Sequence, residues 1–336
     1  MSAENAVAVL GAGNWGTTLA QLVAENGFDV RLWSRDPEQV REIEETRLNP
    51  RGMPGLVLSP RVRATAEFAR AVRGAEVVLL VVPAQAMRQV ARSLGDVLSP
   101  EQLVLHAAKG LELGTLARMS QVLAEETCAK RIGVIAGPNI APEIAAGEPA
   151  GTVASSRFPE VVRCAKRLLT SNRFLVFGGT DVVGVELASA LKNVVAIAAG
   201  MAHAMGMGEN AMSLLVTRGL AEVTAIGSSF GARPATLSGL AGVGDLMVTC
   251  RSKHSRNHRI GEALARGESL EAAVARLGMV AEGVTTAVAA RALAAERGLE
   301  CPLLERVYSV LHEGLAPTEA LEQLLRLRAG RDVAWS

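Results

Sequence analysis

One lysine interrupts an apolar stretch of the chain and is the first candidate for chemistry. Residues 184–205, GVELASALKNVVAIAAGMAHAM, are almost wholly apolar except for Lys192 and Asn193 near the centre. The apolar side chains recur at helical spacing, which predicts a helix buried in a protein interior. A desolvated ammonium there is suited to bind an anion, or to stabilise negative charge that develops on an oxygen.

Two structural explanations for Lys192 compete with a functional one. A membrane span is rejected, because only about nine apolar residues separate Asn193 from His203 and a mid-helix lysine costs ~2.5 to 3.5 kcal/mol. A lysine that reaches the surface or pairs with a carboxylate stays open on this segment alone. Other motifs in the chain are needed to distinguish that explanation from an active site.

A second polar group occurs in residues 239–257, GLAGVGDLMVTCRSKHSRN. Asp245 and Thr249 are four apart, so they share one face if the segment is helical. The basic and hydroxyl residues that follow are suited to a phosphate, because arginine offers a planar fork for two oxygens; a charged surface loop is the alternative. This cluster comprises Arg251, Ser252, Lys253, Ser255, Arg256 and Asn257.

A histidine pair in the same region has metal-compatible spacing. His254 and His258 are four residues apart, but no third ligand lies near them in the sequence. Because a zinc site needs at least three protein ligands, we expect no metal site.

The N-terminus carries a dinucleotide-binding pattern. Residues 6–10, AVAVL, predict a buried strand, and GAGNWG follows at once with Gly11, Gly13 and Gly16 in GxGxxG order. A helix is predicted for residues 17–26 and a second strand for residues 29–33. Glycines in this context allow a tight turn and a close backbone approach to a pyrophosphate at a helix N-terminus.

The end of the second strand bears on which dinucleotide binds. An acidic residue here is typical of NAD sites, whereas this strand ends in Ser34 and Arg35. Arg35 suits a 2′-phosphate, so NADP is favoured and NAD stays open. Asp36 either bonds the ribose or, with Pro37 after it, begins a helix.

Strands and helices alternate through the first half of the chain. Such alternation predicts an α/β domain with a doubly wound, mainly parallel sheet, followed by an all-α domain, with ranges 1–180 and 181–336. Ligands of these sheets bind beyond the carboxyl ends of strands, where Pro83, Lys109 and the segment GPNIAPE, residues 137–143, occur. Residues 49–55, NPRGMPG, form either a lid or a simple connection. The remaining predicted strands are 77–83, 102–107, 131–137, 151–156 and 174–177.

Composition excludes several classes of protein. The 336 residues carry 35 basic and 34 acidic side chains, a net charge of +1, so nothing attracts nucleic acid or membrane surfaces in general. Aromatic residues are only 3%. Four cysteines without a CxxC pair are typical of reduced thiols, and the start of the chain lacks the basic and apolar regions of a signal peptide. We expect a cytoplasmic protein with no membrane insertion.

Together these motifs resemble one family, the bacterial-type NAD(P)-dependent glycerol-3-phosphate dehydrogenases, over nearly the whole chain. The matching segments are GAGNWGTTLA, KGLE, GPNIAPE, GVELASALKNVVAIAAG, GLAGVGDLMVTCRSKHSRN and AEGVTTA. The resemblance implies a Rossmann domain and reversible reduction of dihydroxyacetone phosphate to sn-glycerol 3-phosphate for phospholipid synthesis. It implies NADP or NAD as cofactor and no metal, and a homodimer is an open possibility.

The resemblance also implies roles for individual residues. Lys192 matches the catalytic lysine and Thr249 its active-site network, and we count Lys109 and Asp245 with them. The expected substrate-binding residues are Lys109, Gly137, Asn139, Lys192, Asn193, Asp245, Ser255, Arg256 and Asn257. The expected cofactor-binding residues are Gly11, Gly13, Asn14, Trp15, Gly16, Ser34, Arg35, Pro83, Lys109, Ala141, Arg256, Val280 and Glu282.

Two departures and two rival functions accompany this interpretation. The family commonly has serine at Asn139, and a tyrosine–leucine pair where this chain has Gly52 and Met53, which puts a closing role of that loop in doubt. A 3-hydroxy-acid dehydrogenase would need a carboxylate site in place of residues 255–257. A non-catalytic NADP sensor would not need Lys192 and Asp245 together.

Hydride transfer to a ketone leaves negative charge on its oxygen, so the site needs a positive donor and a proton. We expect Lys192 to supply both. Burial and Lys109 would lower its pKa from ~10.4, and Asp245 would oppose that shift. The sequence does not decide which influence is larger.

Overall fold

The computed structural model describes residues 6–278 and 281–326, which group into two compact units. The first unit contains the chain up to Ala108 and from Met119 to Val182, and the second contains Lys109–Arg118 and the chain from Val183. Residues 109–118 therefore leave the first half of the sequence and fold with the second. The predicted domain ranges, 1–180 and 181–336, do not include this return and remain a prediction.

The first unit is built on an eight-stranded sheet in the order β10-β9-β8-β7-β6-β1-β2-β5. Neighbouring strands are parallel except for the antiparallel pair β8 and β9, so the predicted doubly wound, mainly parallel sheet is confirmed. The strands are β1 (Ala6–Leu10), β2 (Asp29–Trp33), β5 (Val62–Thr65), β6 (Val77–Leu80), β7 (Leu103–His106), β8 (Ile132–Ala136), β9 (Ala150–Ser156) and β10 (Phe174–Gly179).

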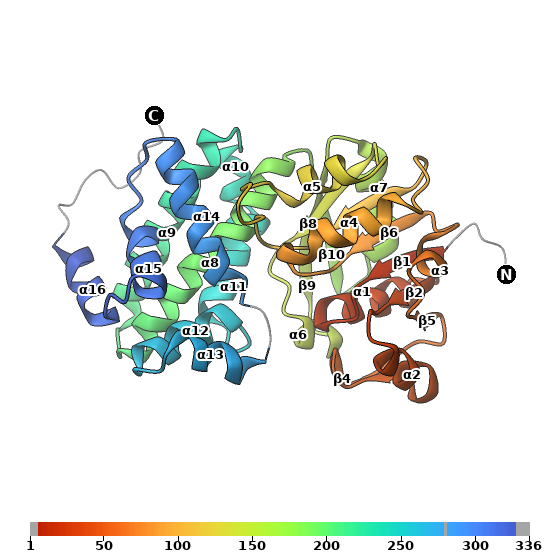
Figure 1. Cartoon of the computed structure of the whole chain (residues 1–336), viewed down its shortest axis with the longest axis horizontal. Helices are drawn as coiled ribbons and strands as arrows, with labels where there is room; N and C mark the ends of the chain where they lie inside the picture. The colour runs from red at the N-terminus through yellow and green to blue at the C-terminus, as the bar shows by residue number, and fades with distance from the viewer. Residues whose placement is uncertain (1–5, 279–280, 327–336) are drawn as a thin grey trace. The chain divides into compact units, whose positions relative to one another are not determined.

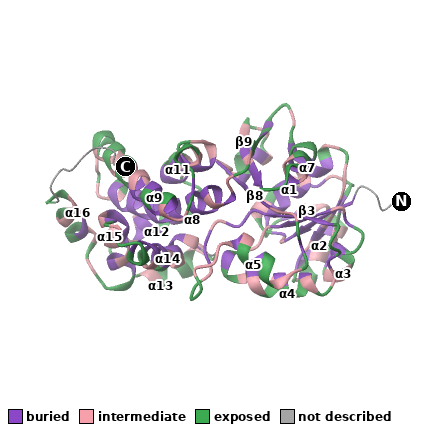
Figure 2. Cartoon of the chain, turned by 90° about the horizontal axis from the view of Figure 1, so that it is seen from above, coloured by how far each residue is buried: buried purple, intermediate pink, exposed green. Residues whose placement is uncertain are grey.

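Helices cover both faces of this sheet, which explains its apolar central strands. Every residue of β1 and of β6 is buried, as parallel strands covered on both faces require. Figure 2 shows α1 and α7 on one side of the sheet and α4 and α5 on the other. The helices of this unit are α1 (Asn14–Glu25), α2 (Pro37–Thr46), α3 (Phe68–Val72), η2 (Ala84–Ala86), α4 (Met87–Gly95), α5 (Met119–Glu126), α6 (Ala141–Ala145) and α7 (Pro159–Leu169).

The segment 49–55 is a hairpin and not an open loop. Strands β3 (Leu48–Asn49) and β4 (Met53–Val57) pair in antiparallel orientation. The edge strand β5 that follows was not predicted, because it has only four residues and only its first and last are buried. Short edge strands carry little of the apolar pattern on which sequence prediction depends.

From Val183 on, the regular structure of the described residues is helical, as predicted, whereas residues 109–118 of this unit are not helical and contain an isolated bridge between Leu111 and Arg118. Figure 1 shows its helices around α8. They are α8 (Val182–Ala204), α9 (Glu209–Ser229), α10 (Pro234–Leu237), the π-helical turn η3 (Leu240–Gly244), α11 (Asp245–Arg251), α12 (Arg256–Ala265), α13 (Leu270–Leu277), α14 (Glu282–Glu296), α15 (Pro302–His312) and α16 (Pro317–Leu325).

Helix α8 forms the centre of the second core. By length and composition it is the one helix of the described chain that could cross a membrane, but 89% of its apolar window is buried inside the protein. Its residues pack with Val223, Leu246 and Ile260 from three other helices. This is the buried, almost wholly apolar helix that the sequence of residues 184–205 predicts.

Two glycines let α8 and α12 cross almost backbone to backbone. A Cβ atom on Gly200 would lie 2.0 Å from the carbonyl oxygen of His258, and one on Gly261 would lie 2.0 Å from that of Ile197. Neither position has room for a side chain. Because the two backbones are this close, the crossing fixes the position of α8 relative to α12.

Candidate active site

The glycine loop of the first unit has the shape that its motif predicts. Gly11 adopts φ +119°, and a Cβ there would lie 2.3 Å from the carbonyl oxygen of Val81. A Cβ on Gly16 would lie 1.8 Å from the carbonyl oxygen of Gly11, whereas one on Gly13 would meet nothing within 4 Å. Gly13 caps α1 without a side-chain hydrogen bond, so the first amides of this helix face an open cradle. The cradle fits a pyrophosphate.

A buried polar network that the sequence prediction missed holds this loop from behind. The Asn49 side-chain amide donates to the carbonyl of Ala12 at 3.0 Å and to Thr17 Oγ1 at 2.7 Å. Gln39 Nε2 also donates to the carbonyl of Ala12, at 2.9 Å, and Gln39 Oε1 accepts from Ser34 Oγ at 2.6 Å. Ser34 is thus tied to the loop through Gln39. The one available signal was that Asn49 begins the turn-rich segment 49–55, which says nothing of its partners.

Arg35 and Asp36 separate at the end of β2. Arg35 is exposed directly after the strand. Asp36 caps α2 by accepting from the backbone amides of Glu38 and Gln39, and it forms an ion pair with Arg51. Of the two alternatives for Asp36, the structure shows the helix start, which leaves Arg35 as the charged group available at this strand end.

The remaining predicted residues of the first unit lie at strand ends. Pro83 is exposed after β6, and Ala141 is the first residue of α6. Asn139 ties its loop to β9, since its Nδ2 donates to the carbonyl of Gly151 at 3.0 Å and its Oδ1 accepts from Thr152 Oγ1 at 2.9 Å. A Cβ on Gly137 would lie 3.0 Å from Thr152 Cα, so this turn is close-packed. The predicted cofactor residue Val280 lies outside the described residues.

In the second unit the structure brings both predicted lysines to one carboxylate. Lys192 Nζ lies 2.7 Å from Asp245 Oδ1, and Lys109 Nζ lies 2.8 Å from Asp245 Oδ2. Lys192 also donates to Thr249 Oγ1, which in turn donates to the carbonyl of Asp245 at 2.6 Å. Asp245 and Thr249 do share one face of α11, as their spacing predicts. Four residues from three parts of the sequence form this cluster, hereafter the lysine cluster: Lys109, Lys192, Asp245 and Thr249.

Burial decides the protonation of Lys192. Only 5% of its side chain is exposed, compared with 20% for Lys109. Desolvation lowers the pKa of Lys192 to about 8; Asp245 raises it by charge and hydrogen bonding, and the charge of Lys109 lowers it further. Of the opposing influences on the pKa of Lys192 that the sequence left undecided, burial is therefore the largest. An ammonium of this pKa exchanges a proton near neutral pH.

A chain of amides connects the lysine cluster to two other helices. Asn193 Nδ2 donates to the carbonyl of Lys109 at 3.0 Å, and Asn193 Oδ1 accepts from Asn257 Nδ2 at 2.9 Å. Asn257 Oδ1 accepts from the backbone amide of Gly283 at 2.9 Å. Gly283 was not predicted, and no Cβ fits there, because it would lie 2.7 Å from the carbonyl oxygen of Asn193. Asn257 is thus held on two sides and positions the start of α12.

The rest of the predicted phosphate cluster lies at that helix start. Ser255 caps α12, its hydroxyl accepting from the backbone amide of His258 at 3.3 Å. Arg256 is the first residue of α12 and is exposed, and the charge of Glu282, the first residue of α14, acts on it. An exposed guanidinium at a helix N-terminus combines two features that bind phosphate groups.

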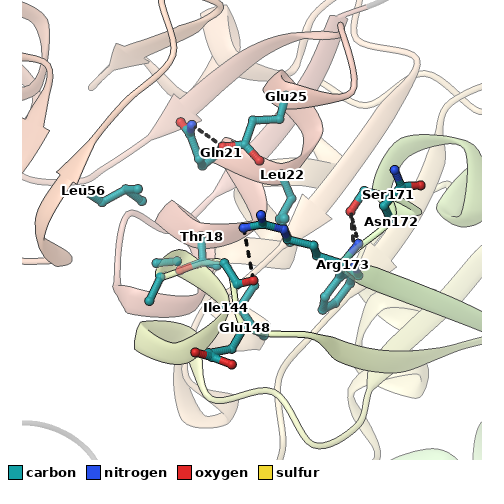
Figure 3. A pocket seen from close by; sticks show the side chains of 14 residues that line it. Thr18, Gln21, Leu22, Glu25, Leu56, Ile144, Glu148, Ser171, Asn172 and Arg173 are labelled. Atoms are coloured by element: carbon teal, nitrogen blue, oxygen red, sulfur yellow. Dashed lines mark hydrogen bonds between the residues drawn. The ribbon is translucent and has the colours of Figure 1, made fainter.

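A separate pocket of about 430 Å³ in the first unit involves none of the predicted site residues. Thr18, Gln21 and Glu25 of α1 line it together with residues 144–148 and 171–174 (Figure 3). Two hydrogen bonds join polar groups of its lining: Gln21 donates to Glu25 at 2.7 Å, and Arg173 donates to the carbonyl of Gly147 at 3.4 Å.

The chain is similar to known proteins over nearly its whole length. Family models described as the N-terminus and the C-terminus of NAD-dependent glycerol-3-phosphate dehydrogenase match residues 6–162 and 181–322. Among curated proteins, the glycerol-3-phosphate dehydrogenase (NAD(P)+) of Geobacter sulfurreducens is 44% identical over 322 residues, 95% of this chain and 96% of that protein. That of Azotobacter vinelandii is 44% identical over 333 residues, 99% and 98% of the two chains. A solved structure of glycerol-3-phosphate dehydrogenase from Coxiella burnetii superposes with a TM-score of 0.93 at 34% identity, covering 97% of this chain and all 100% of that one.

Proposed function

Because this chain belongs to the family of NAD-dependent glycerol-3-phosphate dehydrogenases, we propose that it reversibly reduces dihydroxyacetone phosphate to sn-glycerol 3-phosphate. The observation that carries this proposal within the molecule is the buried lysine cluster, in which one ammonium of lowered pKa is oriented by Asp245 and Thr249. The product is a precursor of phospholipids, and we propose a cytoplasmic, homodimeric enzyme that uses NADP or NAD and no metal in the reaction.

The glycine loop, Ser34 and Arg35 would hold the dinucleotide, which supplies the hydride when bound. Lys192 would donate a hydrogen bond to the ketone oxygen, stabilise the negative charge that develops on it, and transfer the proton that completes the alcohol. Asp245 holds the two ammonium groups of Lys192 and Lys109 in place. Arg256 would bind the substrate phosphate, since its planar fork matches two phosphate oxygens.

The direct test is an assay of absorbance loss at 340 nm with dihydroxyacetone phosphate and either NADPH or NADH. We expect oxidation of both cofactors, with NADPH favoured because exposed Arg35 follows β2 at the position that meets the adenosine ribose. Replacing Arg35 by alanine should raise KM for NADPH about tenfold or more and leave KM for NADH within about twofold, since only NADPH carries the 2′-phosphate. An equal effect on both cofactors would remove Arg35 from 2′-phosphate recognition. No oxidation of either by folded protein that binds dinucleotide would reject the activity itself.

The pKa of Lys192 predicts how the two directions of the reaction depend on pH. Reduction needs the ammonium, so kcat/KM for dihydroxyacetone phosphate should be constant below about pH 8 and fall about tenfold per unit above it. Oxidation of glycerol 3-phosphate needs the neutral amine, so its kcat/KM should rise up to about pH 8 and then level off. Both profiles are to be measured at constant ionic strength. A reduction profile that is flat from pH 7 to about 10 would contradict the role of Lys192 as proton donor.

A further inference from the structure

Three groups that bind metals converge away from the lysine cluster. His203 lies in the last turn of α8, and His258 and Glu262 lie one turn apart on α12. His203 Nδ1 is 3.0 Å from Glu262 Oε1 and 3.3 Å from His258 Nε2, and His258 Nε2 is 3.8 Å from the same Glu262 oxygen. The proposed reaction uses none of the three side chains.

These separations suit a single bound ion. A circle through the three atoms has a radius of about 2.0 Å, which equals the length of zinc bonds to imidazole nitrogen and carboxylate oxygen. An ion slightly above the plane of the three atoms would reach all of them at normal bond length.

The crossing of α8 and α12 makes this arrangement rigid. Gly200 and Gly261 let the two helices touch, and His203 lies three residues after Gly200 while Gly261 lies between His258 and Glu262. Both labelled views place α8 and α12 side by side (Figures 1 and 2). The backbones that carry the ligand residues are therefore held in close contact, which favours a preformed metal site.

The three side chains are exposed to solvent to different extents, and this favours a bound ion. The side chain of His258 is 6% exposed, that of Glu262 20%, and that of His203 60%, so the site is closed on the protein side and open on one side to solvent. The neighbouring positive charge is Arg266, 3.7 Å from Glu262 but 68% exposed and able to move aside.

From this geometry we propose that His203, His258 and Glu262 form a site for a divalent transition metal of the zinc class. Two imidazoles and one carboxylate are a ligand set that zinc and cobalt accept, with water in the fourth, solvent-facing position. The ion would tie the last turn of α8 to α12. It would act as a structural clamp and take no part in the hydride transfer.

The fold also shows why the sequence analysis did not find this group of three ligands. The pair considered there was His254 and His258, four residues apart with no third ligand nearby. In the structure His258 is one ligand, but its partners are His203, 55 residues earlier, and Glu262 on its own helix. His254 does not belong to the group.

The test is a titration of the untagged, full-length protein, stripped of metal, with Zn²⁺ by calorimetry and with Co²⁺ by visible absorption. We expect one saturable equivalent per chain, an absorption band of tetrahedral cobalt, and a higher Tm with Zn²⁺. His203→Gln and Glu262→Gln should each weaken binding at least about tenfold. Both side chains lie at the open side of the site, so these variants should fold. His312→Gln and Cys128→Ser, which change groups outside the cluster, should bind as the unchanged protein does.

Three outcomes would overturn the proposal. One is the absence of saturable Zn²⁺ binding by folded protein. Another is equal affinity in the unchanged protein and in His203→Gln and Glu262→Gln, which would locate the ion elsewhere. The third is loss of binding in Cys128→Ser, which would assign the ion to the exposed thiol.

Discussion

Replacing Lys192 by alanine should lower kcat for dihydroxyacetone phosphate reduction by about 10² to 10⁴, the range in which positioned proton donors and oxyanion partners contribute. The reason is specific to this position. Lys192 is the buried ammonium of the lysine cluster, its pKa is lowered to about 8, and Asp245 and Thr249 fix its direction. Lys109 keeps Asp245 paired after the substitution, so the loss should come from the missing proton donor and not from an unpaired carboxylate.

Three measurements separate this role from a structural one. Dinucleotide affinity, measured by fluorescence titration, should remain within about twofold, because the predicted dinucleotide residues that fold around the glycine loop belong to the first unit. Lys192→Met, which keeps most of the packing volume, should show the same loss of kcat as the alanine variant. Lys130→Ala, at an exposed lysine, should be fully active. Near-normal turnover in either Lys192 variant would remove this residue from catalysis.

Two single-methyl changes in the glycine loop should both weaken dinucleotide binding but differ in their effect on stability. In Gly16→Ala the new Cβ would lie 1.8 Å from the carbonyl oxygen of Gly11, so the loop must move, at a cost of about 1 to 3 kcal/mol in the free energy of unfolding. In Gly13→Ala the Cβ meets nothing within 4 Å and φ is −78°, so stability should change by less than about 0.5 kcal/mol. The open space at Gly13 is where a pyrophosphate would approach, so this variant should bind NADPH at least about tenfold more weakly.

Urea unfolding and dinucleotide titration of both variants provide the comparison. Gly27→Ala is not a suitable control variant, because the positive φ of Gly27 would add backbone strain. The pattern matters more than either value: Gly13→Ala should be stable but poor in binding, and Gly16→Ala poor in both. Normal dinucleotide affinity in Gly13→Ala would mean that the phosphates do not lie against this turn.

Local patterns in the sequence predicted the elements that are regular and the residues that stand out from them. The all-apolar β1 and the GxGxxG turn indicated the dinucleotide fold, and the family comparison confirms it. Lys192 stood out because a charge in an apolar helix is rare. Asp245 and Thr249 could be placed on one face because helical spacing is local.

What the sequence did not predict depends on contacts between distant residues. Asn49 and Gln39 are ordinary polar residues in the sequence, and only the fold shows that both bond to the carbonyl of Ala12. The partner of His258 is likewise 55 residues away. Spacing rules relate neighbours along one element, whereas these pairs are created by packing between elements, which no local pattern specifies.

Residues 109–118 fold with the second unit, and this affects the order in which parts of the protein fold during translation. Lys109 and Asp245 are 136 residues apart, so at ~5 to 20 residues per second the ribosome adds Asp245 roughly 7 to 27 s after Lys109. In that interval most of the first unit's sheet has emerged, while the Asp245 carboxylate that pairs with Lys109 has not yet been synthesised. The dinucleotide loop can therefore mature on the nascent chain well before the lysine cluster exists, and nascent chains arrested before residue 245 should bind dinucleotide without being able to catalyse.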